Sequence, residues 1–261
     1  MLISIITVCF NAEKYIEKTI LSVINQNYKN IEYIIIDGKS TDSTVEIIKK
    51  YESKISFWSS EPDNGIYDAM NKGVNIASGE IIYFLNSDDF LYNNLVISNI
   101  LNIFQTNYTL DFVYGKINRF TASKSGLILD IDFNKNNLRK GKMPSHQAIF
   151  VKRNLFEKFG FFDLTYKSAA DFEFICKIFV NKIKFEKADT IVANYSIEGY
   201  SNTDTTGIKE CLQIIKKYFG RTNYFISVFR YIPIIIFRKI AKYFGIMKIY
   251  RRNIYPKLIR K

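Results

Sequence analysis

Two adjacent aspartates, Asp88 and Asp89, are the first candidates for chemistry. They follow the apolar run Ile-Ile-Tyr-Phe-Leu at residues 81–85, from which Asn86 and Ser87 separate them. Two carboxylates at the mouth of a buried strand repel each other unless a cation or solvent relieves them. Mg²⁺ or Mn²⁺ accepts one or two protein carboxylates and completes its coordination with phosphate oxygens and water. The alternative is a turn or a helix N-cap, a role that Asp also suits.

Asp37 and Asp171 are carboxylates in two other settings. Asp37 ends the apolar run 31–36, where it could accept a hydrogen bond from a nucleobase or a ribose hydroxyl, or simply begin a turn at Gly38. Asp171 follows two alanines and opens an apolar helix. A helix N-terminus favours the ionised carboxylate, which could then act as a base at neutral pH. The alternative is an ordinary acid of the first turn.

His146 is the only histidine of the chain. It could touch a phosphate or complete a metal's coordination, although a lone histidine is more often structural. The sequence contains neither the G-x-x-x-x-G-K phosphate loop nor G-x-G-x-x-G. Binding of ATP by a phosphate loop and Rossmann-type dinucleotide binding therefore lack their usual glycines.

Strands and helices alternate through residues 1–90, which predicts a mostly parallel α/β sheet with helices on both faces. Strands are expected at 2–9, 31–36, 55–58 and 80–85, and helices at 13–26, 43–51 and 66–77. In such sheets ligands bind beyond the carboxyl ends of the strands. The segments 10–12, 37–41 and 86–89 should therefore converge at one edge.

The alternation weakens after residue 90. Helices are expected at 93–105, 153–159 and 171–180, strands at 112–114 and 148–151, a hairpin within 116–132, and edge strands at 183–185 and 190–195. We therefore expect one domain over 1–207, with a nucleotide-binding half at 1–90 and an acceptor half at 91–207, followed by a helical extension at 208–261.

The basic charge of the protein is confined to that extension. The chain has 37 Lys and Arg, 25 Asp and Glu and a net charge of +12; from Lys209 onward there are 14 bases and one acid, which gives 14 − 1 = +13. A nucleic-acid-binding protein usually carries its bases on the folded body, so we expect no nucleic-acid partner. Aromatic and basic residues on a helix instead favour contact with an anionic membrane surface. The extension could alternatively pack on the body or on the mate of a homodimer.

The chain is expected to be cytoplasmic and peripheral on the inner face of the cell membrane. Its three cysteines are widely spaced, which favours reduced thiols, and its N-terminus lacks the features of an export signal. The most apolar stretch, residues 224–237, is shorter than the roughly 20 residues that span a bilayer.

Six stretches together resemble glycosyltransferase family 2, a family of inverting enzymes with the GT-A fold. They are SIITVCFN at 4–11, IDGKSTD at 36–42, EPDNGIYDAMNKG at 61–73, GEIIYFLNSDD at 79–89, HQA at 146–148 and AADFE at 169–173. The resemblance covers about residues 2–200. Its version of the third stretch is similar to that of bacterial enzymes that build exopolysaccharide, capsule or O-antigen.

The resemblance implies a nucleotide-sugar donor, with a UDP-sugar expected, and a lipid-linked or oligosaccharide acceptor. It implies Asp171 as the general base and Mn²⁺ or Mg²⁺ held by Asp88 with Asp89 beside it. The donor-binding residues that it implies are Phe10, Asn11, Asp37, Asp63, Tyr67, Asn71, Lys72, Ser87, Asp88 and His146. The Gln-x-x-Arg-Trp motif of processive synthases is absent, which favours transfer of a single sugar.

Three positions depart from the family pattern. Asn86 replaces the first acid of D-x-D, Gly38 replaces a second acid after the second strand, and Ala170 replaces an acid before the base. Two other functions stay open at this stage. One is a nucleotidyltransferase that makes a nucleotide-sugar, and the other is a protein that binds sugar nucleotides without turnover.

Overall fold

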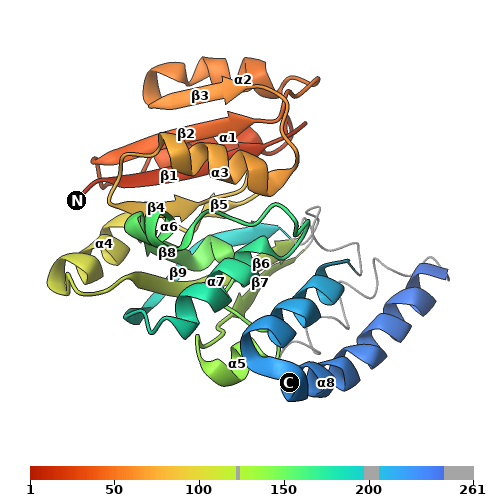
Figure 1. The fold of residues 1–261 in the computed structure, drawn as a ribbon. Helices are drawn as coiled ribbons and strands as arrows, with labels where there is room; N and C mark the ends of the chain where they lie inside the picture. The colour runs from red at the N-terminus through yellow and green to blue at the C-terminus, as the bar shows by residue number, and fades with distance from the viewer. Residues whose placement is uncertain (122–123, 197–205, 244–261) are drawn as a thin grey trace.

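The computed structural model describes residues 1–121, 124–196 and 206–243. Within these ranges the strands form one mixed sheet in the order β3-β2-β1-β4-β8-β6-β9-β5, with β7 paired to β6. The strands are β1 Ile3–Cys9, β2 Ile31–Asp37, β3 Phe57–Ser60, β4 Ile81–Phe84, β5 Phe90–Leu91, β6 Phe112–Thr121, β7 Lys124–Leu129, β8 Ile149–Lys152 and β9 Phe185–Ser196. The predicted α/β sheet is confirmed (Figure 1).

Helices pack on both faces of this sheet (Figure 1). The helices are α1 Ile16–Ile24, α2 Thr44–Lys50, α3 Ile66–Ile76, α4 Val96–Thr106, α5 Lys135–Arg139, α6 Asn154–Phe159, α7 Ala170–Val180 and α8 Thr206–Tyr243, with 3₁₀ turns η1 Glu52–Lys54 and η2 His146–Ala148. Helices α1 and α4 share one core with the sheet, and α3, α6 and α7 share the core on the other face. Alternate residues of β1 feed the two cores: Ile6 and Val8 face α3, whereas Ile5 and Cys9 face α1.

The strand directions bring distant segments to one edge of the sheet. Strands β1, β2 and β4 are parallel, so their carboxyl ends share that edge. Strand β8 runs antiparallel to β4, which puts the amino end of β8, and η2 before it, beside the carboxyl end of β4. Strand β6 is antiparallel to β8 and β9 is parallel to β6, so β9 ends at the same edge. Residues 146–148 and residue 196 therefore join the segments that were predicted to converge at this edge.

The second half differs from expectation at β9. Two edge strands were expected there, whereas Phe185–Ser196 is one strand between β6 and β5. The first half of β9 is mostly exposed, so its sequence lacks a clear alternation, and its pairing with β6 spans about 70 residues of chain. Long-range pairing of this kind leaves little local trace.

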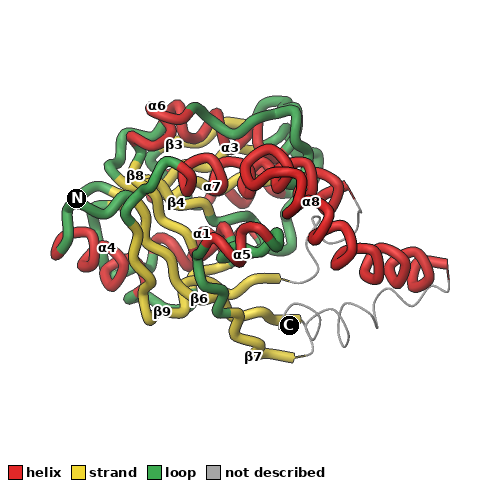
Figure 2. The backbone as a smooth tube through the Cα atoms, turned by 60° about the horizontal axis from the view of Figure 1, so that its bottom comes forward, coloured by secondary structure: helices red, strands yellow, loops and turns green. Residues whose placement is uncertain are grey.

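Helix α8 forms the first part of the helical extension expected from residue 208. The helix breaks at Gly220, whose φ is 85°. Before the break, Ile214 and Ile215 are completely buried in the same core as α7. After the break the helix runs outward along the end of α5 (Figure 2). Within the described residues no helix combines the length and the apolar content needed to cross a membrane.

Candidate active site

Phe10, Gly38 and Asp63 meet where β1 and β2 end. The Phe10 ring is 63% exposed, which is unusual for an aromatic side chain directly after a buried strand. A Cβ at Gly38 would lie 2.5 Å from Asp63 Oδ2 and 3.5 Å from Phe10 Cδ2, so the glycine makes room for the Asp63 carboxylate beside the ring. Asp63 Oδ1 accepts a hydrogen bond from Gly65 N. An open aromatic face next to a carboxylate oxygen suits a flat base that carries an N–H group.

Asp37 supports this corner through its hydrogen bonds. Its side chain is completely buried. Its carboxylate accepts hydrogen bonds from Ser40 N at 2.9 Å, from the Ser40 hydroxyl, and from Ser60 Oγ at 2.6 Å. These hydrogen bonds shape the turn after β2, and the direct contact of Asp37 with base or ribose stays a prediction.

Asn11 also organises this turn. It has a φ of 49°, its Oδ1 accepts from Thr41 N at 2.9 Å, and its own N–H donates to Ser40 Oγ at 2.8 Å. The following helix, α1, begins only at Ile16. Asn11 thus ties the loop after β1 to the loop after β2, and Phe10 projects from this tied loop.

Asp88 and Asp89 lie next to each other but have different environments. Asp88 is half-buried, and its carboxylate receives no side-chain hydrogen bond from the residues that the structure describes. Burial raises the pKa of the Asp88 carboxyl, because the charged form loses solvation. A cation bound there would remove this penalty.

Asp89 is completely buried. Its Oδ2 accepts from Gln147 Nε2 at 2.8 Å and its Oδ1 from Ser196 N at 3.0 Å. Burial and the neighbouring charge of Asp88 raise the pKa of Asp89. Both carboxylate oxygens are thus used to join β4 to η2 and β9. These contacts give Asp89 a structural role, and its expected part in holding a metal stays a prediction.

Asp171 lies in a chain of polar contacts that joins four elements. Its Oδ1 accepts from Tyr67 Oη at 2.9 Å and from Phe172 N at 2.8 Å. Its Oδ2 lies 3.4 Å from His146 Nδ1. On the other side of the ring, His146 Nε2 lies 3.1 Å from Asn86 Nδ2. Both carboxylate oxygens of Asp171 thus have contacts, and its side chain is 17% exposed.

Tyr67 and Asn86 lie at the two ends of this series of polar contacts. Burial, followed by the charge of Asp171, raises the pKa of Tyr67 far above its ordinary value, so the phenol stays protonated and donates. The Oδ1 of Asn86 is buried and has no hydrogen-bond partner among the described residues. Either orientation of the amide leaves one polar atom of Asn86 without a partner among the described residues. Such an orphaned group suits a polar ligand.

Three other residues expected at the donor, Asn71, Lys72 and Ser87, have contacts of their own within the protein. Asn71 exchanges hydrogen bonds with the backbone of Phe162, at 2.9 and 3.0 Å, and so fixes the loop before α7. Lys72 Nζ donates to Pro62 O at 2.8 Å and pairs with Glu61 at 3.0 Å. The expected contacts of both residues with the donor stay predictions. Ser87 is half-buried at the edge, and Thr19 Oγ1 donates to its carbonyl oxygen at 2.8 Å.

The described residues contain no group of three or more His, Cys, Asp or Glu side chains arranged to hold a metal ion. A divalent cation at Asp88 would therefore need most of its ligands from a bound diphosphate and water, which is common for Mg²⁺ in proteins. The half-buried carboxylate of Asp88 fits that role, because it is a hard oxygen donor whose charged form is disfavoured by burial.

Comparison with known proteins gives a consistent family. Residues 4–160 match the family described as glycosyl transferase family 2. Over 177 residues the chain is 34% identical to an uncharacterized glycosyltransferase of Mycobacterium tuberculosis (strain CDC 1551 / Oshkosh), covering 67% of this chain and 68% of that protein. Over 206 residues it is 32% identical to a PGL/p-HBAD biosynthesis glycosyltransferase of Mycobacterium bovis (strain BCG / Pasteur 1173P2), covering 77% and 79%.

Solved structures of two glycosyltransferases share the fold. S. aureus TarS 1–349 in complex with UDP-GlcNAc has a TM-score of 0.67 at 20% identity, over 84% of this chain and 66% of that chain. The mannosyltransferase PcManGT from Pyrobaculum calidifontis, in complex with GDP-Man and Mn²⁺, has a TM-score of 0.60 at 18% identity, over 87% and 64%. The chain thus spans about two thirds of these proteins, and the expected GT-A fold is confirmed.

Proposed function

The chain belongs to glycosyl transferase family 2, and from that premise we propose that it transfers one sugar, with inversion, from a nucleotide-sugar. Because the family and the relatives are glycosyltransferases, we favour sugar transfer over the alternative of a nucleotidyltransferase. The observation that carries the inverting mechanism is the oriented carboxylate of Asp171, at the edge where Asp88 and the loop after β1 also lie.

We assign Asp171 as the general base and its Oδ2 as the oxygen that takes the proton. Oδ1 accepts the hydrogen bonds from Tyr67 and Phe172 N, whereas Oδ2 has only the longer 3.4 Å contact with His146 Nδ1, so we assign Oδ2 as the oxygen that accepts the proton. In this mechanism the acceptor hydroxyl gives its proton to Oδ2 while its oxygen bonds to the anomeric carbon. The bond from that carbon to the diphosphate breaks on the opposite face, and the nucleoside diphosphate leaves. A single displacement inverts the anomeric configuration.

Asp88, together with the donor's diphosphate, is the residue that would hold Mn²⁺ or Mg²⁺. Such a cation neutralises the charge that develops on a diphosphate leaving group. Asn86 and His146 lie between Asp88 and Asp171, where their polar atoms can orient the diphosphate and the base toward each other.

We assign the base-binding end of the donor to Phe10 and Asp63. The exposed ring of Phe10 offers a stacking surface, and Asp63 Oδ2 offers an acceptor beside it. A uracil base presents one N–H group to such an acceptor, so a UDP-sugar is the donor we expect. The UDP-GlcNAc complex of TarS is consistent with this choice, whereas the GDP-Man complex of PcManGT keeps guanine nucleotides among those to be tested.

The donor can be identified by a screen of UDP-, GDP- and dTDP-sugars with membrane extract as the acceptor source. We expect release of UDP that depends on both the extract and a divalent cation, and a product sugar of inverted configuration by NMR. Nucleotide release that ignores the acceptor, or a product of retained configuration, would contradict the proposal.

The second half of α8 offers a surface for a membrane that carries a lipid-linked acceptor of surface polysaccharide synthesis. Its inner side is fixed to the body, because Ser227 Oγ donates to Arg139 O at 2.8 Å and Tyr231 Oη to Lys140 O at 3.1 Å. Its outer side carries an exposed apolar stripe at helical spacing, which consists of Phe225, Ile226, Phe229, Ile232 and Ile236.

Basic residues flank this stripe. Arg221 and Arg230 lie on the same helix, and residues 209–261 carry a net charge of 14 − 1 = +13. Anionic headgroups attract such a segment by about 1 kcal/mol per basic residue near the surface. Apolar side chains on the same face can enter the lipid interface. We therefore propose that α8 lies on an anionic membrane and holds the edge of the sheet near its acceptor.

Vesicle flotation tests this surface. The protein should float with phosphatidylcholine vesicles only when phosphatidylglycerol is included, and the double variant Phe229→Asp, Ile232→Asp should not float. Tyr108→Asp is the matched control, because Tyr108 is 70% exposed outside α8. Flotation of the double variant, or a dimer in sedimentation velocity that the double variant abolishes without any vesicle binding, would assign the stripe to another partner.

A further inference from the structure

The start of α7, which carries Asp171, lacks a capping side chain of its own. Ala169 occupies the N-cap position, and no side chain caps the helix there. The first N–H groups of a helix and of the turn before it need acceptors, and a local Ser, Thr, Asn or Asp usually provides one. The acceptor for this turn therefore has to come from elsewhere in the chain.

Glu210 of α8 provides it. Glu210 is buried, and its Oε1 accepts from Lys167 N while its Oε2 accepts from Ser168 N, both at 2.9 Å. Two parallel hydrogen bonds from successive N–H groups to one carboxylate fix both the position and the orientation of that backbone. The segment is also held at its other end, where Asn71 exchanges hydrogen bonds with Phe162.

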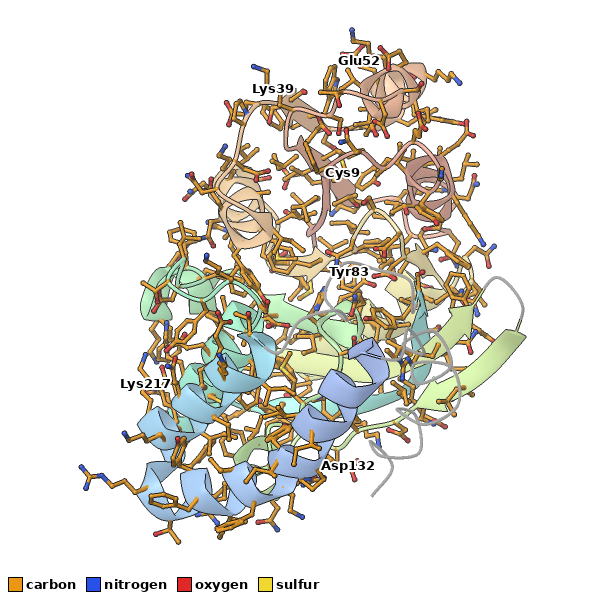
Figure 3. All side chains as sticks on the ribbon, turned by 90° about the vertical axis from the view of Figure 1, so that its right-hand side faces the viewer. Cys9, Lys39, Glu52, Tyr83, Asp132 and Lys217 are labelled. Atoms are coloured by element: carbon orange, nitrogen blue, oxygen red, sulfur yellow. The ribbon has the colours of Figure 1, made fainter. Side chains whose placement is uncertain are left out.

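A second contact joins the same two helices beyond Asp171. Glu173 is 1% exposed and accepts from Lys217 Nζ at 2.8 Å and from the Tyr218 hydroxyl. Burial by itself would raise the pKa of Glu173, but these hydrogen bonds outweigh it and hold the pKa below its ordinary value. Lys217 lies on the part of α8 that packs against the body (Figure 3). Helix α8 thus contacts the turn before Asp171 through Glu210, and it contacts Glu173 after Asp171 through Lys217 and Tyr218.

We propose that Glu210 is a positioning residue for Asp171, acting through the backbone of Lys167 and Ser168. This inference rests on the proposed role of Asp171 as the base. Glu210 does not touch the base; it sets where the first turn of α7 begins and therefore where the Asp171 carboxylate points. Helix α8 accordingly serves the reaction as well as the proposed membrane contact.

The test compares Glu210→Ala and Glu210→Gln in the full chain. A misplacement of a catalytic group by about 1 Å can cost about 100-fold, so we expect kcat to fall about 10- to 100-fold in the alanine variant. The affinity for UDP should stay unchanged, because Phe10 and Asp63 lie on other elements. Hydrogen exchange should become faster at the amides of Lys167 and Ser168. Glutamine keeps one acceptor oxygen and should give an intermediate kcat.

Glu157→Gln is the control, because Glu157 forms an exposed ion pair with Arg153 and should change none of these quantities. A wild-type kcat in Glu210→Ala would overturn the positioning role. A loss of UDP binding in proportion to the loss of kcat would also overturn it, because that pattern indicates general unfolding. Asp171→Asn is measured in parallel: normal transfer by that variant would refute the proposed function itself, a result distinct from a normal Glu210→Ala.

Discussion

Replacing Asp88 with asparagine should stabilise the protein without ligands and weaken the stabilisation that ligands provide. Burial raises the pKa of the Asp88 carboxyl, so the folded protein pays to keep this group charged at neutral pH. Asparagine keeps the shape and removes the charge. It also removes the oxygen ligand that we assign to the divalent cation.

The size of the first effect follows from linkage. Each unit by which the folded pKa exceeds the unfolded pKa costs about 1.4 kcal/mol once the group is ionised in both states. A stabilisation on the order of 1 kcal/mol corresponds to a rise in Tm of about 2–4 °C for a chain of this size. Below the unfolded pKa both proteins carry a neutral group and the difference vanishes. It should grow as the pH rises from the unfolded pKa to the raised pKa of Asp88 and stay constant above that pKa.

The second effect, weaker stabilisation by ligands, lowers the Tm of the variant relative to wild type. Ligand present at about 100 times its Kd stabilises a folded protein by about 2.7 kcal/mol. Wild type should gain several degrees in Tm from UDP with Mn²⁺, and Asp88→Asn should gain much less. The assay is thermal unfolding from about pH 5 to about pH 8, with and without these ligands. A variant less stable than wild type without ligands would refute the burial argument, and an equal gain from UDP with Mn²⁺ would refute the metal assignment.

The neighbouring residue should behave differently: Asp89→Asn should lower Tm by several degrees with or without ligands, because one of two buried N–H donors loses its acceptor, at about 1–3 kcal/mol. Tyr67→Phe should lower kcat about tenfold at unchanged UDP affinity, since the Asp171 carboxylate loses a hydrogen bond; an unchanged kcat in a steady-state assay would contradict this. Gly38→Ala should weaken UDP binding about tenfold in calorimetry, because its Cβ would displace Asp63; wild-type affinity would separate Asp63 from the base.

Much of the nucleotide-binding half could be predicted from local sequence. Buried parallel strands are short, apolar and β-branched, and turn residues follow them, so the strand ends could be placed to within a few residues. That placement was enough to expect Phe10, residues 37–41 and residues 86–89 at one edge. The helix that opens at Asp171 was also visible, because its apolar pattern follows two alanines.

The sequence could not show which polar side chains form hydrogen bonds with backbone groups far along the chain. Asn71 pairs with Phe162, 91 residues away, and Asp89 bonds Ser196, 107 residues away. Nothing near either residue indicates its partner, and each therefore looked available for a ligand. The contact between His146 and Asp171 was likewise invisible, since it depends on β8 running antiparallel to β4.

The burial of the first half of α8 did have a signal in the sequence. Ile208, Leu212 and Ile215 follow the spacing i, i+4, i+7 of an apolar helix face, and all three are buried. The strongly basic composition of residues 209–261 outweighed that signal and led to the expectation of a separate extension. Composition averages over a segment, whereas burial depends on which face of the helix each residue occupies.

The rate of sugar transfer by Asp171→Asn tests the central claim most directly. Asparagine keeps the shape of the side chain but cannot accept the acceptor's proton, so transfer should fall by about 100- to 10,000-fold while UDP still binds. Asp189→Asn, which alters only an exposed ion pair with Lys116, should transfer at the wild-type rate. Near-normal transfer by Asp171→Asn would contradict the account, because the proton would then have to go to another group.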